Sequence, residues 1–319
     1  MKKGLLIALI PVLSACFKKE IPVEKPVSGA TTAQVELGGN YANQIYYDLE
    51  TNTVLRQNNR EVWDLAFEAG ESGFHILLNE SRVMAAALSS ETDINALTSV
   101  AGLTYIWDLH TGNLDSTAIR NWQSLGKVYA IDMGTGLSGA SLGKKKLKVL
   151  SVSNTEYQIQ FADLNSSAIN TFTIPKSEIA GFTYFSMTGS GVLMDIEPAK
   201  ETWDLVFTAY CHVFDEHTPY SVVGVLSNRY GVKVQEVSIP FADFRHSDIV
   251  ESEFEDRINV IGYDWKTYDF DNGTYVVSSN RTFVVKTING RYYKLRFVDY
   301  YDQNGVKGAP KFELQELIP

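Results

Sequence analysis

Apolar and polar residues alternate along many short stretches of this chain. In the stretch YQIQF, Tyr157, Ile159 and Phe161 fall on one side and the glutamines on the other, which is typical of a half-buried β-strand. The stretches RYYKLRFVDY, GTYVVSS and RTFVVKTI predict further strands, and turns rich in glycine or asparagine separate them. No apolar period of 3.6 residues persists for four turns. The pattern predicts an all-β protein of antiparallel sheets with a few short helices, one of them at 89–100.

Two segments of the chain resemble each other. YYDLETNTVLRQNNREVWDLAF (46–67) and YFSMTGSGVLMDIEPAKETWDLVF (184–207) each combine an aromatic pair, a turn, a Val-Leu strand, a polar loop and the motif Trp-Asp-Leu-x-Phe. Each motif is followed by an apolar strand that ends in asparagine, Asn79 in the first copy and Asn228 in the second. We interpret the two segments as an internal repeat of one supersecondary unit.

The Trp-Asp-Leu-x-Phe motif predicts specific roles for its side chains. In a strand, tryptophan, leucine and phenylalanine at i, i+2 and i+4 would point to one face, which would bury Trp63 and Trp203. Asp64 and Asp204 would lie on the opposite face. Such a fixed aspartate is expected to accept backbone N–H bonds from a neighbouring turn, with catalysis or metal binding as the alternative.

The second copy carries an insertion. Its tryptophan and asparagine are 25 positions apart, against 16 in the first copy, and the nine extra residues fall within AYCHVFDEHTPY. An insertion into one copy of a repeated scaffold is a natural place for specialised function. We therefore expect a flexible loop here that carries His212 and His217.

The N-terminus has the pattern of a bacterial lipoprotein signal. Lys2 and Lys3 precede the apolar run GLLIALIPVL, which is too short to span a bilayer, and the run ends in LSAC with Cys16. This resembles a lipobox, in which the signal peptide (1–15) is removed and the cysteine thiol carries lipid. Several acyl chains on Cys16 would hold the protein on a membrane. Residues 16–34, with two prolines and alternating charges, are predicted to be a flexible tether.

Beyond the tether, the repeat suggests an N-terminal β-rich unit over 35–178 and a C-terminal β domain over 179–319, which could also form one compact body. The net charge of −10 argues against nucleic acid as a partner. With Cys16 lipidated, Cys211 has no partner, so we expect no disulfide and a buried thiol. The motif GTGLSG matches GxGxxG but is followed by another strand, so it predicts a hairpin loop. No motif indicates an enzyme.

Taken with the lipobox and the repeat, the C-terminal stretches FVVKTINGRYYKLRF and GVKGAPKFEL resemble the HmuY-like family of haem-binding surface lipoproteins of Gram-negative anaerobes. The resemblance is strongest over 182–319. It implies an all-β, sandwich-like HmuY-type fold, a lipid anchor in the outer membrane, haem capture at the cell surface and an outer-membrane haem transporter as partner. A non-haem adhesin or a glycan- or protein-binding lipoprotein is the alternative.

Known haem-binding members of that family hold iron with two histidines or two methionines. His212 and His217 are the candidate histidine ligands here, although a solvated loop with one packed histidine has the same pattern. A zinc site from Cys211, His212 and His217 lacks the usual ligand spacing.

Met187 and Met194 are the candidate methionine ligands, and they flank the turn TGSG. If Met187 pairs with Val192 in a hairpin, Met194 pairs with Phe185, and both sulfurs lie on one face of the hairpin. Methionines that fill gaps in a core have the same pattern.

Overall fold

The computed structural model describes residues 29–215 and 218–319, and nearly all of its regular structure is antiparallel β-sheet. The all-β prediction is therefore confirmed. The strands are β1 (Thr31–Gln34), β2 (Asn43–Asp48), β3 (Thr53–Asn59), β4 (Leu65–Glu68), β5 (Ile76–Leu78), β6 (Ala85–Leu88), β7 (Tyr129–Asp132), β8 (Lys144–Val152), β9 (Glu156–Asp163), β10 (Asn170–Pro175), β11 (Phe182–Ser186), β12 (Val192–Met194), β13 (Leu205–Phe214), β14 (Thr218–Ser227), β15 (Lys233–Val237), β16 (Lys266–Asp269), β17 (Thr274–Val277), β18 (Thr282–Lys286), β19 (Tyr292–Tyr301) and β20 (Lys307–Glu316).

Helical structure in the described residues is limited to short segments. These are α1 (Trp122–Leu125) and the 3-10 turns η1 (Glu80–Arg82), η2 (Leu114–Ser116), η3 (His246–Asp248) and η4 (Glu251–Glu253). The helix predicted at 89–100 is absent, and bends and turns occupy that segment instead. The motif GTGLSG lies between the antiparallel strands β7 and β8, as predicted for a hairpin loop.

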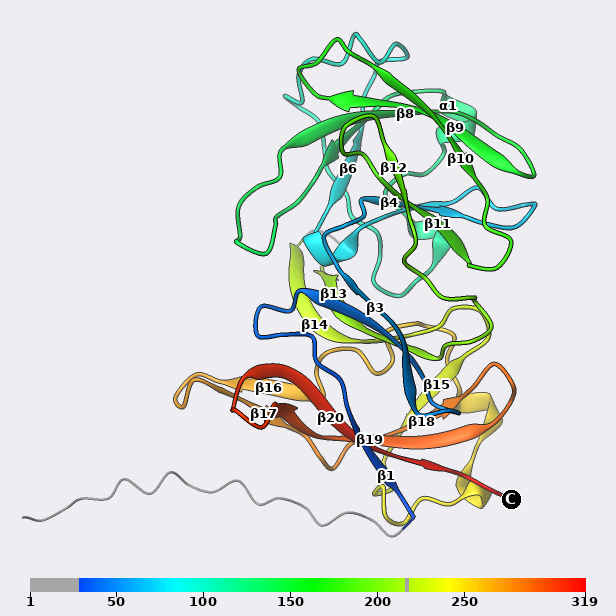
Figure 1. Cartoon of the computed structure of the whole chain (residues 1–319), viewed down its shortest axis with the longest axis vertical. Coiled ribbons are helices and arrows are strands. Elements are labelled where there is room, and N and C mark those ends of the chain that lie inside the picture. Colours follow the sequence, from blue (N-terminus) through cyan, green and yellow to red (C-terminus); the bar gives the residue numbers. More distant parts are fainter. Residues whose placement is uncertain (1–28, 216–217) are drawn as a thin grey trace, which may run out of the picture.

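Four sheets are stacked as successive layers (Figure 1). The upper lobe consists of the sheets β10-β9-β8-β7-β6 and β12-β11-β4-β5, and the lower lobe of the sheets β14-β13-β2-β3 and β1-β20-β19-β18-β15. One apolar core fills each lobe between its two sheets. A third apolar cluster lies between the two middle sheets and joins the lobes. The strands β16 and β17 form a separate ribbon.

The two middle sheets exchange hairpins. The β2-β3 hairpin of the first segment pairs with β13 of the second, and the β11-β12 hairpin of the second pairs with β4 of the first. The register places Tyr47 opposite Leu205 and Phe185 opposite Leu65. The predicted boundary between 178 and 179 therefore does not separate two sheets, because each side of it contributes strands to both middle layers.

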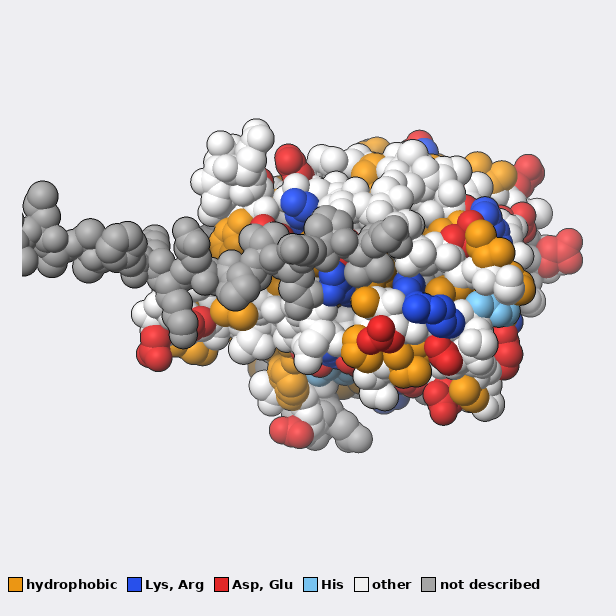
Figure 2. Space-filling view, turned by 90° about the horizontal axis from the view of Figure 1, so that it is seen from below, with side chains coloured by type: hydrophobic (Ala, Val, Ile, Leu, Met, Phe, Trp, Pro, Cys, Tyr) orange, Lys and Arg blue, Asp and Glu red, His pale blue; other side chains and the backbone are white. Residues whose placement is uncertain are grey.

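The folded body also begins earlier than predicted. Residues 31–34, which the sequence pattern assigned to the tether, form β1 and pair with β20. Their alternating small and polar side chains contain no apolar signal, and the unpaired edge of β20 recruits them through backbone hydrogen bonds. On the underside of the lower lobe, acidic, basic and apolar side chains are interspersed where the surface is visible (Figure 2).

Candidate functional site

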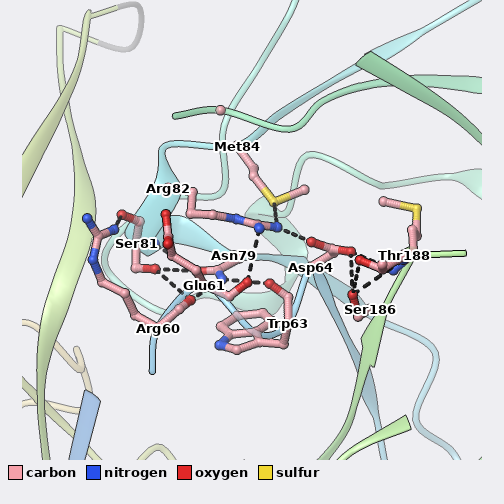
Figure 3. Close-up of polar contacts among 12 residues, drawn as sticks. Arg60, Glu61, Trp63, Asp64, Asn79, Ser81, Arg82, Met84, Ser186 and Thr188 are labelled. Atoms are coloured by element: carbon pink, nitrogen blue, oxygen red, sulfur yellow. Dashed lines mark hydrogen bonds and ion pairs between the residues drawn. The ribbon is translucent and has the colours of Figure 1, made fainter. Parts of the chain in front are cut away.

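The two motif aspartates bind backbone N–H groups, as predicted. The N–H of Met187 donates to Asp64 Oδ2, and the Ser186 hydroxyl donates to the same oxygen at 3.2 Å (Figure 3). The N–H of Leu49 donates to Asp204 Oδ2 at 2.8 Å. Asp64 thus fixes the turn after β11, the strand that pairs with β4, and Asp204 fixes the turn after β2, the strand that pairs with β13.

The two asparagines close the same units. The side-chain amide of Asn79 donates to the carbonyls of Arg60 and Trp63 at 2.7 and 2.8 Å (Figure 3). Asn228 makes the corresponding two bonds in the second segment, also at 2.7 and 2.8 Å. Both asparagines are fully buried, so these bonds satisfy carbonyls that water cannot reach.

A cation distinguishes the two units. Asp64 forms a buried ion pair with Arg82, which follows Asn79 in η1 (Figure 3). Asp204 has no such partner among the described residues. Burial raises the pKa of Asp204 to about 7. Equivalent positions in the two segments therefore carry different electrostatics.

The motif tryptophans face the space between the lobes. Trp63 packs edge-on against Tyr184 and Trp203 packs edge-on against Tyr46, each with ring centroids 4.9 Å apart. Leu65 and its motif counterpart in β13 face the lobe cores instead. The prediction that tryptophan shares a face with leucine was wrong, because each strand begins at the leucine and the preceding tryptophan lies outside the ladder.

A cavity of about 100 Å³ lies between the lobes, and we call it the interlobe cavity. The rings of both tryptophans and three tyrosines line it together with carboxyl groups and one guanidinium. Its principal lining residues are Tyr46, Trp63, Glu80, Tyr184, Glu197, Trp203, Tyr210 and Arg229. The cavity therefore combines apolar ring surfaces with a few polar groups, as small-molecule sites do.

Several carboxyl groups at and near this cavity hold protons unusually tightly. Burial raises the pKa of Glu80 to about 8, of Glu197 to about 7 and of Asp108 to about 6. The positive charge of Arg229 lowers the pKa of each of these three carboxyl groups and so partly offsets the effect of burial. The Oε2 atom of Glu197 also accepts two backbone N–H bonds of 3.1 Å, which lowers its pKa relative to burial alone.

These shifts predict that acidification stabilises the fold. Four carboxyl groups have pKa values in the folded protein above the value near 4 of an unfolded carboxyl group; they belong to Glu80, Asp108, Glu197 and Asp204. Their contribution to the free energy of unfolding is therefore complete below about pH 4 and is lost as the pH rises through 6 to 8. We expect the melting temperature to be higher at pH 5.5 than at pH 8.5 by about 3 °C or more. Calorimetry at the two pH values measures it. The double variant E80Q/E197Q should show a flatter dependence, and a lower melting temperature at pH 5.5 in the parent protein would contradict the prediction.

The insertion was predicted to be a loop, but its described residues lie in two long paired strands. Its residues extend β13 and β14, which pair continuously from Leu205 opposite Ser227 to Phe214 opposite Thr218. His212 therefore lies within a strand, opposite Tyr220. Apolar alternation in the inserted residues allows the two strands to lengthen together, and cross-strand hydrogen bonds then fix them.

His212 meets a second histidine from the other lobe. The ring of His110, which lies on the loop before η2, packs on the His212 ring with centroids 3.8 Å apart. His110 Nδ1 accepts the N–H of Val213 at 3.2 Å, so the neutral ring carries its proton on Nε2. The Nδ1 atom of His212 is buried and has no hydrogen-bond partner. We call these two side chains the histidine pair.

Aromatic rings surround the histidine pair. His212 lies 4.4 Å from the Phe214 ring and 5.2 Å from the Tyr263 ring, measured between centroids. Burial lowers the pKa of His110 to about 4, with further lowering by His212 and Arg257, and burial also lowers the pKa of His212. Both imidazoles are consequently neutral at physiological pH, which is the state that binds metal.

The structure does not bring the two candidate methionines together. Ser186, not Met187, is opposite Val192, and Met194 is opposite Tyr184. Met187 is fully buried in the upper-lobe core, whereas Met194 packs against the cluster between the lobes. The predicted shared face was wrong by one residue of register, and one residue moves a side chain to the other face of a sheet.

Other sequence predictions have different outcomes. Cys16 and His217 lie outside the described residues. Cys211 is free and buried, and burial raises the pKa of its thiol to about 12. His110 was not among the predicted ligands, because it is 102 positions from His212 and sits in a polar turn with no local signal of function. Only the approach of the two lobes reveals it.

Within 29–215 and 218–319, no cluster of three or more histidine, cysteine or acidic side chains is arranged to hold a metal ion. In the same part of the chain, no helix has the length and apolar character needed to cross a bilayer.

Comparison with known proteins places the chain in a family. Residues 40–314 match the model of the HmuY protein family. Among solved structures, apo PinO from Porphyromonas gingivitis is 12% identical, with a TM-score of 0.30 and coverage of 91% of this chain and 97% of that one. The apo HmuY analog TFO from Tannerella forsythia is 11% identical, with a TM-score of 0.27 and coverage of 93% and 99%. A comparison with curated proteins found no significant match. The family match confirms the predicted resemblance, and the chain belongs to the HmuY family.

Proposed function

We propose that this protein is a lipid-anchored haem-binding protein of the cell surface and that the histidine pair binds the haem iron. The observation that supports this most directly is the meeting of two neutral imidazoles, one from each lobe, beside exposed aromatic rings. Haem iron takes one or two axial ligands of this type. The haem-binding members of the family make haem the expected cofactor.

The residues around the histidine pair fit haem better than the interlobe cavity does. A cavity of about 100 Å³ is smaller than one that holds benzene, so a porphyrin is excluded from it. At the end of the β13-β14 hairpin, Phe214 and Tyr220 expose 39% and 61% of their surfaces, which offers apolar faces to a porphyrin. His110 and His212 would hold the iron through their imidazoles, and because the two rings are stacked with centroids 3.8 Å apart, they would have to separate to admit it.

Charge near the histidine pair also suits this ligand. Haem carries two propionates, and Arg257 is close enough to His110 to lower the pKa of that imidazole. Arg257 is exposed and pairs with Glu255 at 2.6 Å, a weak surface contact that a propionate could replace. The role of Arg257 would be to orient haem, because the net charge of −10 does not attract an anion from a distance.

The anchor rests on the sequence. Cys16 is the proposed lipidation site, and β1 begins at Thr31, so a short linker would separate the lipid from the sheet. The proposed location is the outer membrane, where the protein would capture haem and pass it to a haem transporter. Labelling of cells with a radioactive fatty acid should mark the parent protein but not the variant Cys16→Ala.

A haem titration tests the proposal. We expect the soluble body to shift the Soret band on binding ferric haem, and H110A and H212A each to weaken binding at least tenfold, since each removes a proposed iron ligand. H75A is the matched control, because His75 pairs with Glu68 in the upper lobe at 2.6 Å. Since burial lowers the pKa of His110 to about 4, binding should persist to about pH 5.

Two results would contradict the proposed site. Absence of any Soret shift would remove haem as the ligand. A shift that both H110A and H212A leave unchanged would keep haem but discard the histidine pair. The variants H217A, M187L and M194L would then identify the ligand among the remaining candidates.

A further inference from the structure

Four polar groups of three kinds at the wall of the interlobe cavity lack hydrogen-bond partners. They are the indole Nε1 atoms of Trp63 and Trp203, the hydroxyl of Tyr210 and the Oε2 atom of Glu80. Trp63 and Tyr210 expose only 7% and 1% of their surfaces, so bulk water does not satisfy them. Buried polar groups without partners are rare and costly. Their convergence on one cavity indicates a ligand that supplies the missing bonds.

The chemistry of these three kinds of group restricts the ligand. The indole N–H of Trp63 only donates, so it requires an acceptor, which a simple ammonium ion does not have. An anion has acceptors, but two carboxyl groups, Glu80 and Glu197, line the cavity against a single guanidinium, that of Arg229, so this lining does not favour added negative charge. A hydroxyl group both donates and accepts, and it can pair with all three.

The aromatic walls favour the same class of ligand. The rings of Tyr46, Tyr184 and the two motif tryptophans line the cavity, and their edge-on packing holds them rigidly. The C–H groups of a polyol or a sugar present apolar surface to such rings while the hydroxyls reach the polar groups. A volume of about 100 Å³ admits a unit of about six non-hydrogen atoms, because a cavity of about 150 Å³ holds benzene.

A second hollow adjoins the cavity and gives room for a longer molecule. Arg229 and Ile258 line both spaces. The outer hollow has further walls from 111–114 of the upper lobe and 256–257 of the lower lobe. A chain whose terminal unit occupied the interlobe cavity could therefore continue into the outer hollow between the lobes.

From these observations we propose that the interlobe cavity binds a small neutral polyhydroxylated molecule, a polyol or the terminal unit of a glycan. Trp63 and Tyr210 would donate to its hydroxyl oxygens, and Glu80 would pair with one of its hydroxyl groups. The histidine pair does not line this cavity, so the polyol proposal does not depend on haem binding.

Indole N–H resonances of ¹⁵N-labelled protein test the proposal. We expect glycerol and erythritol to shift the Trp63 resonance, and that of Trp203, in a saturable way. Trp265 is the internal control, because its ring is fully buried in the lower-lobe core. A Trp63→Phe variant assigns the first resonance. Tetramethylammonium chloride and sodium acetate, at the same concentrations, should leave the Trp63 resonance unshifted.

The variant Tyr210→Phe gives an independent readout. It removes an unpartnered buried hydroxyl, so the free protein should melt at a higher temperature while erythritol binds about tenfold more weakly. If the Tyr210 hydroxyl had only a structural role, the variant would not raise the melting temperature and lower the erythritol affinity together. Thr282→Val is the matched control, because Thr282 in β18 also has a buried unpartnered hydroxyl but does not line the cavity. It should leave erythritol binding unchanged.

Several outcomes would overturn the proposal. They are the absence of a saturable Trp63 shift with either polyol, an equal shift of Trp265, a response to the ammonium ion or to acetate alone, and unchanged erythritol affinity in Tyr210→Phe. H212A should bind erythritol normally, so a failure here is distinguishable from a failure of the haem site.

Discussion

Replacement of Asp64 with asparagine is expected to destabilise the protein by about 3–5 kcal/mol. Asp64 and Arg82 expose only 3% and 5% of their surfaces and form an ion pair (Figure 3). Asparagine would keep an acceptor for the Met187 N–H but would leave the Arg82 guanidinium buried without a counter-charge. Loss of one partner from a buried pair is costly because the remaining charge stays desolvated. Urea denaturation followed by circular dichroism measures the change.

Asp204→Asn is the matched control for Asp64→Asn. Asp204 occupies the corresponding place in the second segment and accepts the Leu49 N–H at 2.8 Å, but it has no cationic partner in the described structure. Burial raises its pKa to about 7, so a neutral side chain suits the site. We expect Asp204→Asn to change stability by less than about 1 kcal/mol at pH 8. Equal losses in the two variants would show that the aspartates act only as backbone acceptors.

Gly134→Ala is expected to cost about 3–4 kcal/mol, the second large effect. Gly134 has φ +68°, and a Cβ there would lie 1.9 Å from the carbonyl oxygen of Arg82. That carbonyl also accepts the N–H of Thr135 at 3.0 Å, so the backbone around the buried ion pair would have to move. The same denaturation experiment measures the loss.

Gly139→Ala separates the clash from the backbone strain. Gly139 lies in the same hairpin loop with φ +79°, but no heavy atom lies within 4 Å of the position of its Cβ. Only the left-handed conformation is unfavourable there, so the expected cost is about 1 kcal/mol. If both variants lost the same stability, the contact with Arg82 would not be what requires glycine at 134.

Local sequence patterns were sufficient to predict the fold class and the roles of several side chains. Period-two alternation predicted strands such as β9 and β19, and the Trp-Asp-Leu-x-Phe motif predicted buried rings and N–H-binding aspartates. These inferences hold because they depend on spacing within a few residues. The family resemblance added the HmuY assignment, which the match over 40–314 confirms.

Other features depend on partners far away in the chain. The register of the β11-β12 hairpin decided that Met187 and Met194 lie on different faces. The continuous pairing of β13 with β14 turned an expected loop into strands. His110 has no neighbour in sequence that marks it, and the histidine pair exists only because the two lobes meet.

The sequence by itself determined an all-β chain with two tryptophan-centred segments, because alternation and turn residues act over short distances. The tertiary structure alone decided that the segments exchange hairpins, that a cavity forms where their tryptophans meet, and that His110 joins His212. The physical reason is that backbone hydrogen bonding is the same for any pair of strands. Which distant strands pair, as β2 does with β13 and β4 with β11, is set by the complementarity of side chains that are more than a hundred residues apart.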